Sequence, residues 1–139
     1  MEQGCRKIQV KEIFFPDTNI ILRYLLKDNE NQYKKISPIF SSIREGVVNA
    51  IIISEVLLET YYVLTKVYDV PFQEALEKLK SLLLYKGMIG EEKNLLIEAI
   101  NYALKGKNVS LLDWILCLKT KKFNGKLLSF EEMLKKKCS

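Results

Sequence analysis

Short apolar runs alternate with longer amphipathic segments along this chain. The short runs predict buried strands, over residues 12–16, 47–53 and 125–129. The longer segments predict helices, over residues 20–26, 31–45, 54–68, 71–84, 91–104 and 110–122, with a short lysine-rich helix at the end. Strands separated by helices predict an α/β fold with a parallel sheet covered on both faces. No internal repeat or linker interrupts the pattern, so residues 1–139 are expected to form a single domain.

Acidic residues follow each expected strand, at the carboxyl ends where a parallel sheet holds its active site, and Asp113 adds one more. Asp17 follows the first expected strand, and Glu59 lies on the helix after the second. Asp113 lies on the helix before the last expected strand, and Glu131 follows that strand. Converging carboxylates repel one another unless a cation neutralises them. The pattern therefore predicts a metal site.

The residue types restrict which metal that site would hold. The chain has no histidine, and its three cysteines are scattered, which argues against zinc and excludes histidine-based catalysis. Ligation by oxygen alone selects Mg²⁺ or Mn²⁺. Such an ion can activate water and stabilise a phosphoryl oxygen, as phosphodiester hydrolysis requires.

Each acid also has a structural interpretation. Asp17, or Thr18, is suited to cap a helix, and Ser110 with Asp113 matches a capping box. The other pairs with such an interpretation are Ser129 with Glu132, as a second capping box, and Glu55 with Glu59, as a solvated helix face. A merely solvated aspartate is poorly placed at position 113, because the surrounding Leu-Leu-Asp-Trp-Ile-Leu is apolar.

The basic excess lies at the C-terminal end. The net charge is +5, and the segment from Lys119 onward, with seven lysines and two glutamates, accounts for all of it. Such a patch favours a polyanion such as RNA, with a solubilising tail as the alternative. The lysines expected to bind RNA are Lys121, Lys122, Lys135, Lys136 and Lys137.

Four blocks of the sequence resemble PIN-domain nucleases, especially the VapC-type toxins. The first is Phe-Pro-Asp-Thr-Asn at residues 15–19, and the others lie at residues 53–64, 109–115 and 127–131. The resemblance implies a PIN-like fold, in which a parallel sheet lies between helices around an acidic pocket for Mg²⁺ or Mn²⁺. It also implies RNA endonuclease activity, often as a toxin with an antitoxin partner, and frequently a homodimer.

The resemblance also implies roles for particular residues. Asp17, Glu59 and Asp113 match the acids of the family's metal site. Thr18 and Asn19 match polar residues that steady the first aspartate, and both are expected to bind substrate. Glu131 stands where the family usually has aspartate, and we expect it to complete the site, directly or through water. Ser110 stands where a further aspartate is frequent.

Those two departures leave a second hypothesis open, a catalytically impaired PIN fold that binds RNA or another protein. Exposed aromatic residues would supply a protein-binding surface, although aromatic residues at helical spacing more often form core; the candidates are Tyr61, Tyr62, Tyr68 and Phe72. Arg23 is expected to be a surface cation.

No apolar stretch approaches the length of a membrane helix, which is about 18 residues. The first residues lack the apolar region of a signal peptide, and unpaired thiols suit a reducing compartment, so we expect a cytoplasmic protein.

Overall fold

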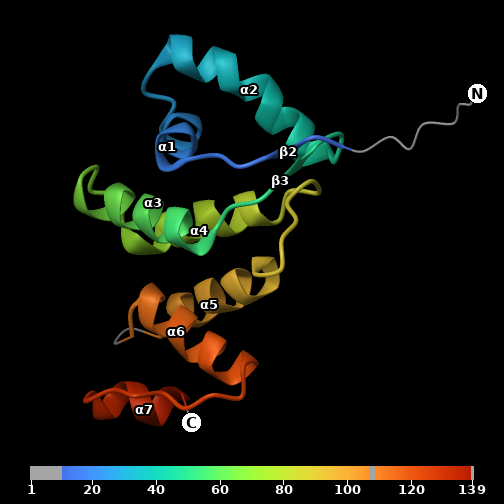
Figure 1. Cartoon of the computed structure of the whole chain (residues 1–139). Helices are drawn as coiled ribbons and strands as arrows, with labels where there is room; N and C mark the ends of the chain where they lie inside the picture. Colours follow the sequence, from blue (N-terminus) through green and yellow to red (C-terminus); the bar gives the residue numbers. More distant parts are fainter. Residues whose placement is uncertain (1–10, 107–108, 139) are drawn as a thin grey trace, which may run out of the picture.

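The computed structural model describes residues 11–106 and 109–138 (Figure 1). Two short strands, β2 (Ile13–Phe14) and β3 (Asn49–Ala50), pair in parallel, with Ile13 opposite Asn49 and Phe14 opposite Ala50. The helices are α1 (Thr18–Leu26), α2 (Glu30–Glu45), α3 (Ser54–Lys66), α4 (Phe72–Leu83), α5 (Lys93–Lys105), α6 (Leu111–Lys122) and α7 (Glu132–Cys138). This confirms the α/β class with parallel pairing, and every expected helix forms.

The helices are stacked in tiers. In Figure 1, α1 and α2 occupy one end of the molecule, α3 and α4 the next tier, α5 and α6 the tier after that, and α7 the opposite end. A cluster of buried apolar side chains draws on all seven helices; Ile21, Phe40, Leu57, Leu76, Leu96, Leu111 and Leu134 are among its members. A smaller cluster of Leu22, Leu64 and Ala75 joins α1, α3 and α4. The core thus fixes how α1, which follows β2, sits against α3.

The parallel pairing continues beyond β3 through the segment that follows α4. The Ala50 N–H donates to the Gly87 carbonyl at 2.9 Å, and the Ile89 N–H donates to the Ala50 carbonyl at 2.9 Å. Only glycine fits at position 87, because a Cβ there would lie 2.6 Å from the carbonyl oxygen of Ile43. β3 is therefore the central member, and β2 forms an edge.

The expected strand over residues 125–129 does not form, which corrects the sequence-based prediction. A strand needs a neighbour for its backbone hydrogen bonds. This segment instead connects α6 to α7, at the opposite end of the molecule from β2 (Figure 1). The Leu128 side chain is 98% exposed there. The other two expected strands form but shorten to two residues each.

The thiols near the C-terminal end are paired. Cys117 of α6 and Cys138 of α7 form a disulfide, with their Cα atoms 5.5 Å apart. This corrects the expectation of unpaired thiols at these two positions. Cys5 and the signal-peptide expectation for residues 1–10 lie outside the described residues. Within the described ranges, no helix has both the length and the apolar character required to cross a membrane.

Candidate functional site

Asp17 is held at the point where the chain leaves β2 and begins α1. It occupies the N-cap position of α1, and its Oδ1 accepts a hydrogen bond from the Ile20 N–H at 2.9 Å. The N-cap interpretation is therefore confirmed as geometry. Cap and ligand are compatible roles, because the bond uses Oδ1 and the side chain stays exposed.

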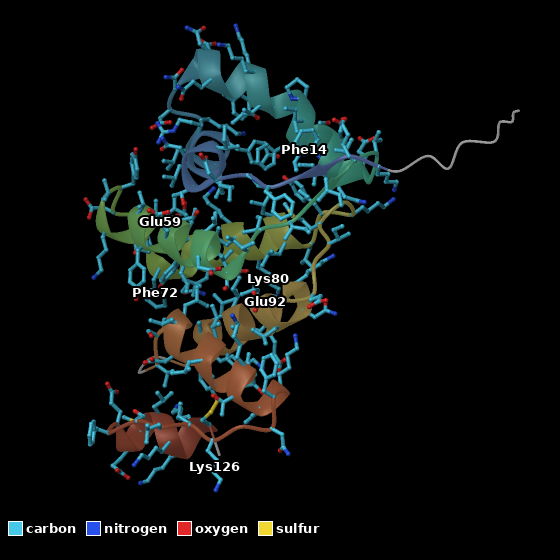
Figure 2. The ribbon with its side chains drawn as sticks, viewed as in Figure 1. Phe14, Glu59, Phe72, Lys80, Glu92 and Lys126 are labelled. Carbon is cyan, nitrogen blue, oxygen red and sulfur yellow. A yellow bond between two sulfur atoms is a disulfide. The ribbon has the colours of Figure 1, made fainter. Side chains whose placement is uncertain are left out.

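Glu59 of α3 lies against the same end of α1. The Thr18 hydroxyl donates a hydrogen bond to Glu59 Oε1 at 2.5 Å, across 41 residues of sequence. A short bond to a carboxylate is of the stronger, charge-assisted kind, so it fixes the orientation of the Glu59 side chain. Figure 2 shows Glu59 on the side of α3 nearest α1. Thr18 thus steadies Glu59, whereas the resemblance to PIN-domain nucleases implied that it steadies Asp17.

A hollow of about 480 Å³ lies where these two helices meet. Asp17, Thr18 and Asn19 line it from α1 and its cap, and Glu59 lines it from α3. Its remaining lining residues are Leu22, Val56, Val63, Val67 and Tyr68. We call this the acidic hollow. It presents two carboxylates beside apolar side chains and the Tyr68 ring.

Glu55, one turn before Glu59, does not line the acidic hollow. Its carboxylate accepts a hydrogen bond from the Ser54 hydroxyl at 3.2 Å. Its pKa is lowered, first by a hydrogen bond from its own backbone N–H, then by Ser54 and by the charge of Lys119. The structure therefore separates the two glutamates of this helix.

Asp113 and Glu131 are held by local hydrogen bonds elsewhere. The Asp113 N–H donates to the Ser110 hydroxyl at 3.1 Å, which is one half of the expected capping box. The Glu131 N–H donates to the Ser129 hydroxyl at 3.0 Å, so Ser129 serves Glu131 in place of Glu132. Across residues 11–106 and 109–138, no three acidic, histidine or cysteine side chains cluster in a way that could hold a metal. The structure brings together Asp17 and Glu59; metal ligation by Asp113 and Glu131 stays a prediction.

The pair of carboxylates in the acidic hollow fits magnesium or manganese. Mg²⁺ usually retains several waters and is held by one or two carboxylates together with substrate phosphates. Asp17 and Glu59 supply that number of carboxylates at an exposed site, and the Thr18 hydroxyl adds an oxygen. The donor set does not suit zinc, which takes four ligands, mostly nitrogen and sulfur.

The C-terminal lysines lie away from the acidic hollow. Lys121 and Lys122 line a different hollow, between α5 and α6, together with Glu91 and Glu98. Lys135 pairs with Glu132 at 3.4 Å on α7. Lys136 and Lys137 lie on the same helix, and Figure 2 shows Lys126 beside α7, with the tier of α5 and α6 between it and Glu59. RNA binding by these lysines stays a prediction.

Arg23 is more ordered than the surface cation that the sequence analysis expected. One guanidinium nitrogen donates to Asp28 Oδ2 and another to the Tyr68 hydroxyl, each at 2.9 Å. The Tyr68 hydrogen bond is the largest cause of its raised pKa. Only 18% of its side chain is exposed. Arg23 is thus a fixed positive charge on α1, close to the acidic hollow.

The four aromatic residues considered for protein binding differ in exposure and in their contacts. Tyr61 is half-buried against both apolar clusters, and burial raises its pKa. Tyr68 is committed to Arg23. Tyr62 and Phe72 are exposed, at 42% and 52%. No continuous aromatic surface follows from these four residues.

The family model of the PIN domain matches residues 14–139, which span both acids of the hollow and nearly the whole chain. No curated protein and no solved structure matches the chain.

Proposed function

Because this chain belongs to the PIN-domain family, whose members are generally nucleases, we propose that it is a metal-dependent endoribonuclease acting on single-stranded or loop RNA. The observation that carries the proposal is the Thr18–Glu59 hydrogen bond, which holds Glu59 beside Asp17 at one exposed hollow. Two such carboxylates without a cation would repel each other, and a phosphodiester brings further negative charge. The site therefore makes chemical sense as a holder for a divalent cation.

In this proposal Asp17 and Glu59 hold Mg²⁺ or Mn²⁺. Bound there, the ion supplies Lewis-acid stabilisation of the charge that develops on the phosphate. Asp17 is oriented by the Ile20 N–H, and Glu59 by the Thr18 hydroxyl, so neither carboxylate has to reorganise when substrate arrives. Since Thr18 occupies Glu59 Oε1, Glu59 Oε2 is the oxygen left to hold the ion.

The narrower resemblance to VapC-type toxins supports a biological role. We propose a cytoplasmic toxin of a toxin–antitoxin pair, with a protein antitoxin and a homodimeric state. Asp113 and Glu131, which lie outside the acidic hollow in this structure, stay predictions as further ligands.

The direct test is cleavage of labelled single-stranded and hairpin RNA with Mg²⁺, with Mn²⁺ and with EDTA. We expect cleavage with either metal, none with EDTA, and none from Asp17→Asn even with metal. Cleavage that survives EDTA, or that Asp17→Asn retains, would overturn the proposal.

One observation favours a second candidate function, a PIN fold that binds RNA without cleaving it. Among the described residues, only two of the four expected carboxylates share the hollow, so the charge that would hold a metal is reduced. The cleavage assay, combined with a gel-shift binding assay, separates the two candidates. A PIN fold that only binds RNA would shift the labelled RNA and leave it intact with every metal.

A further inference from the structure

Asp17 lies at the meeting point of three hollows. The first is the acidic hollow. The second, of about 320 Å³, lies between α1 and α2 and is lined on its polar side by Asn19, Arg23, Gln32 and Lys35. The third, of about 250 Å³, is almost wholly apolar and lies between β2, α1 and α2. Asp17 lines all three, and Ile20 and Ile36 line both the second and the third. The three hollows therefore adjoin one another at Asp17.

The second hollow, which we call the donor hollow, carries groups that suit a phosphate. Lys35 and Arg23 contribute the two positive charges, and the side-chain amides of Asn19 and Gln32 can donate hydrogen bonds. Arg23 is held in place by Asp28 and Tyr68, so its charge does not depend on a mobile side chain. Lys35 is exposed, and within the described parts of the chain no ion pair or hydrogen bond occupies its ammonium group.

The third hollow, which we call the aromatic hollow, carries groups that suit a nucleobase. Phe14 and Phe15 line it from the strand side, and Phe40 and Ile43 line it from α2. The Phe15 side chain is 64% exposed, although it stands next to the core. Figure 2 shows Phe14 in the tier of α1 and α2. A cavity of this size is smaller than the sites that hold drug-sized ligands, so it suits one base rather than a whole nucleotide.

We infer that the face formed by β2, α1 and α2 is the track on which single-stranded RNA enters the site. One unstacked base occupies the aromatic hollow against Phe15, and the adjoining phosphate lies in the donor hollow near Lys35 and Arg23. The next linkage then reaches Asp17 and Glu59. This inference rests on the proposed function and adds to it the substrate-binding residues and the reason for single-strand preference.

Three physical arguments support RNA as the occupant. Alternation of an aromatic surface with basic groups is the usual means of holding single strands without pairing. A duplex keeps its bases stacked inside, so only a single strand or loop can place a base in the aromatic hollow. Charge also decides between occupants: an apolar peptide would fill the aromatic hollow but would leave Lys35 without the counter-charge that Arg23 already has in Asp28.

Binding can be measured without cleavage in a Glu59→Gln background, since glutamine keeps an oxygen for the Thr18 hydroxyl. Labelled single-stranded RNA is titrated at several salt concentrations, followed by fluorescence anisotropy. Phe15→Ala should weaken binding roughly 5- to 100-fold with little change in salt dependence, because stacking is lost and no charge is removed. Lys35→Gln should weaken binding and make the salt slope about 0.7 shallower, because one phosphate contact is lost.

Each variant has a matched control elsewhere on the chain. Lys34 is the exposed neighbour of Lys35 on α2 but does not line the donor hollow. Phe123 is 76% exposed at the end of α6, so Phe123→Ala removes a comparable aromatic ring away from the track. Lys34→Gln and Phe123→Ala should bind RNA as the Glu59→Gln background does. Equal effects of either variant and its control would overturn the inference.

An RNA with one base removed tests the aromatic hollow from the substrate side. When the missing base is the one that enters the hollow, the Glu59→Gln background should bind the abasic RNA as weakly as Phe15→Ala binds the intact strand. Combining the abasic RNA with Phe15→Ala should weaken binding little further. Duplex RNA should bind equally to the background and to Phe15→Ala. If every abasic strand leaves the effect of Phe15→Ala unchanged, the aromatic hollow does not hold a base. A selective effect of Phe15→Ala on binding an apolar peptide, with no effect on RNA, would identify a peptide site.

The outcome can be separated from the fate of the proposed function. Lys35→Gln and Phe15→Ala are also tested for cleavage in a protein with Glu59 intact. If both variants still cleave RNA at the unaltered rate in an EDTA-sensitive way, the proposed nuclease function stands and the RNA track is rejected. Binding that depends on both residues, without any cleavage, would retain the track and reject the nuclease. Absence of measurable RNA binding would reject the track.

Discussion

The two ends of this molecule hold their polar side chains in different ways. At the α1–α3 end, two side-chain bonds connect elements far apart in the sequence: Thr18 reaches Glu59 across 41 residues, and Arg23 reaches Tyr68 across 45. At the α7 end, the polar contacts of Ser129 and Glu132 span two and three residues. A contact between distant elements fixes a side chain relative to two packed helices. A local contact only satisfies the hydrogen-bonding groups of one turn of the chain. The α1–α3 end is therefore the better preorganised place for chemistry.

The largest expected effect distinguishes two glutamates of the same helix. Glu59→Gln should lower RNA cleavage about 100-fold or more, because Glu59 lines the acidic hollow, where it would hold the metal. Glu55→Gln is the matched control, one turn away and outside the hollow, and should change the rate severalfold at most. Steady-state cleavage rates for the two variants decide the matter. Equal losses would mean that the face of α3 is wrongly assigned to the site.

The sequence predicted the α1–α3 end better than the α7 end for a physical reason. Helix α3 and the residues Asp17, Thr18 and Glu59 follow from local periodicity and from a short motif. The strand at 125–129 did not form because strand pairing depends on a distant partner, which local pattern does not report. The apposition of Arg23 and Lys35 was missed because it depends on how α2 packs on α1.

The cysteines show the same limit. Cys117 and Cys138 are 21 residues apart, and no spacing rule identified them as partners.

The Cys117–Cys138 disulfide ties α7 to α6, and its loss should leave the α1–α3 end in place. Cys138→Ser should lower the free energy of unfolding by about 3 kcal/mol, the value for closing a loop of this size. Chemical denaturation, with and without a reducing agent, measures the change. The reducing agent should destabilise the unaltered protein and leave Cys138→Ser unchanged, and RNA cleavage should persist in both. Loss of cleavage on reduction would mean that α7 contributes to the site.

Two substitutions at Asp17 separate its two roles. Asn is as good an N-cap as Asp, so Asp17→Asn should leave the stability of the metal-free protein nearly unchanged. Asp17→Ala loses the cap as well and should cost about 1 kcal/mol. Neither variant should show the thermal stabilisation that Mg²⁺ or Mn²⁺ gives the unaltered protein by mass action. Thermal unfolding with and without metal tests both points. Metal stabilisation that survives Asp17→Asn would place the ion elsewhere.

The smallest effect is expected from the lysines of α7, although three charges are removed together. Changing Lys135, Lys136 and Lys137 to Gln should weaken RNA binding less than the single change Lys35→Gln, because α7 lies at the opposite end of the molecule from the acidic hollow (Figure 1). Any contribution should come from long-range attraction and should therefore disappear as salt is raised, since charges separated by more than about 8–10 Å are screened at physiological salt. Titration of both variants in the Glu59→Gln background, at low and physiological salt, gives the comparison directly. If the triple change costs more affinity at physiological salt than Lys35→Gln does, the RNA path runs along α7, and the net charge of the C-terminal segment identifies the binding surface after all.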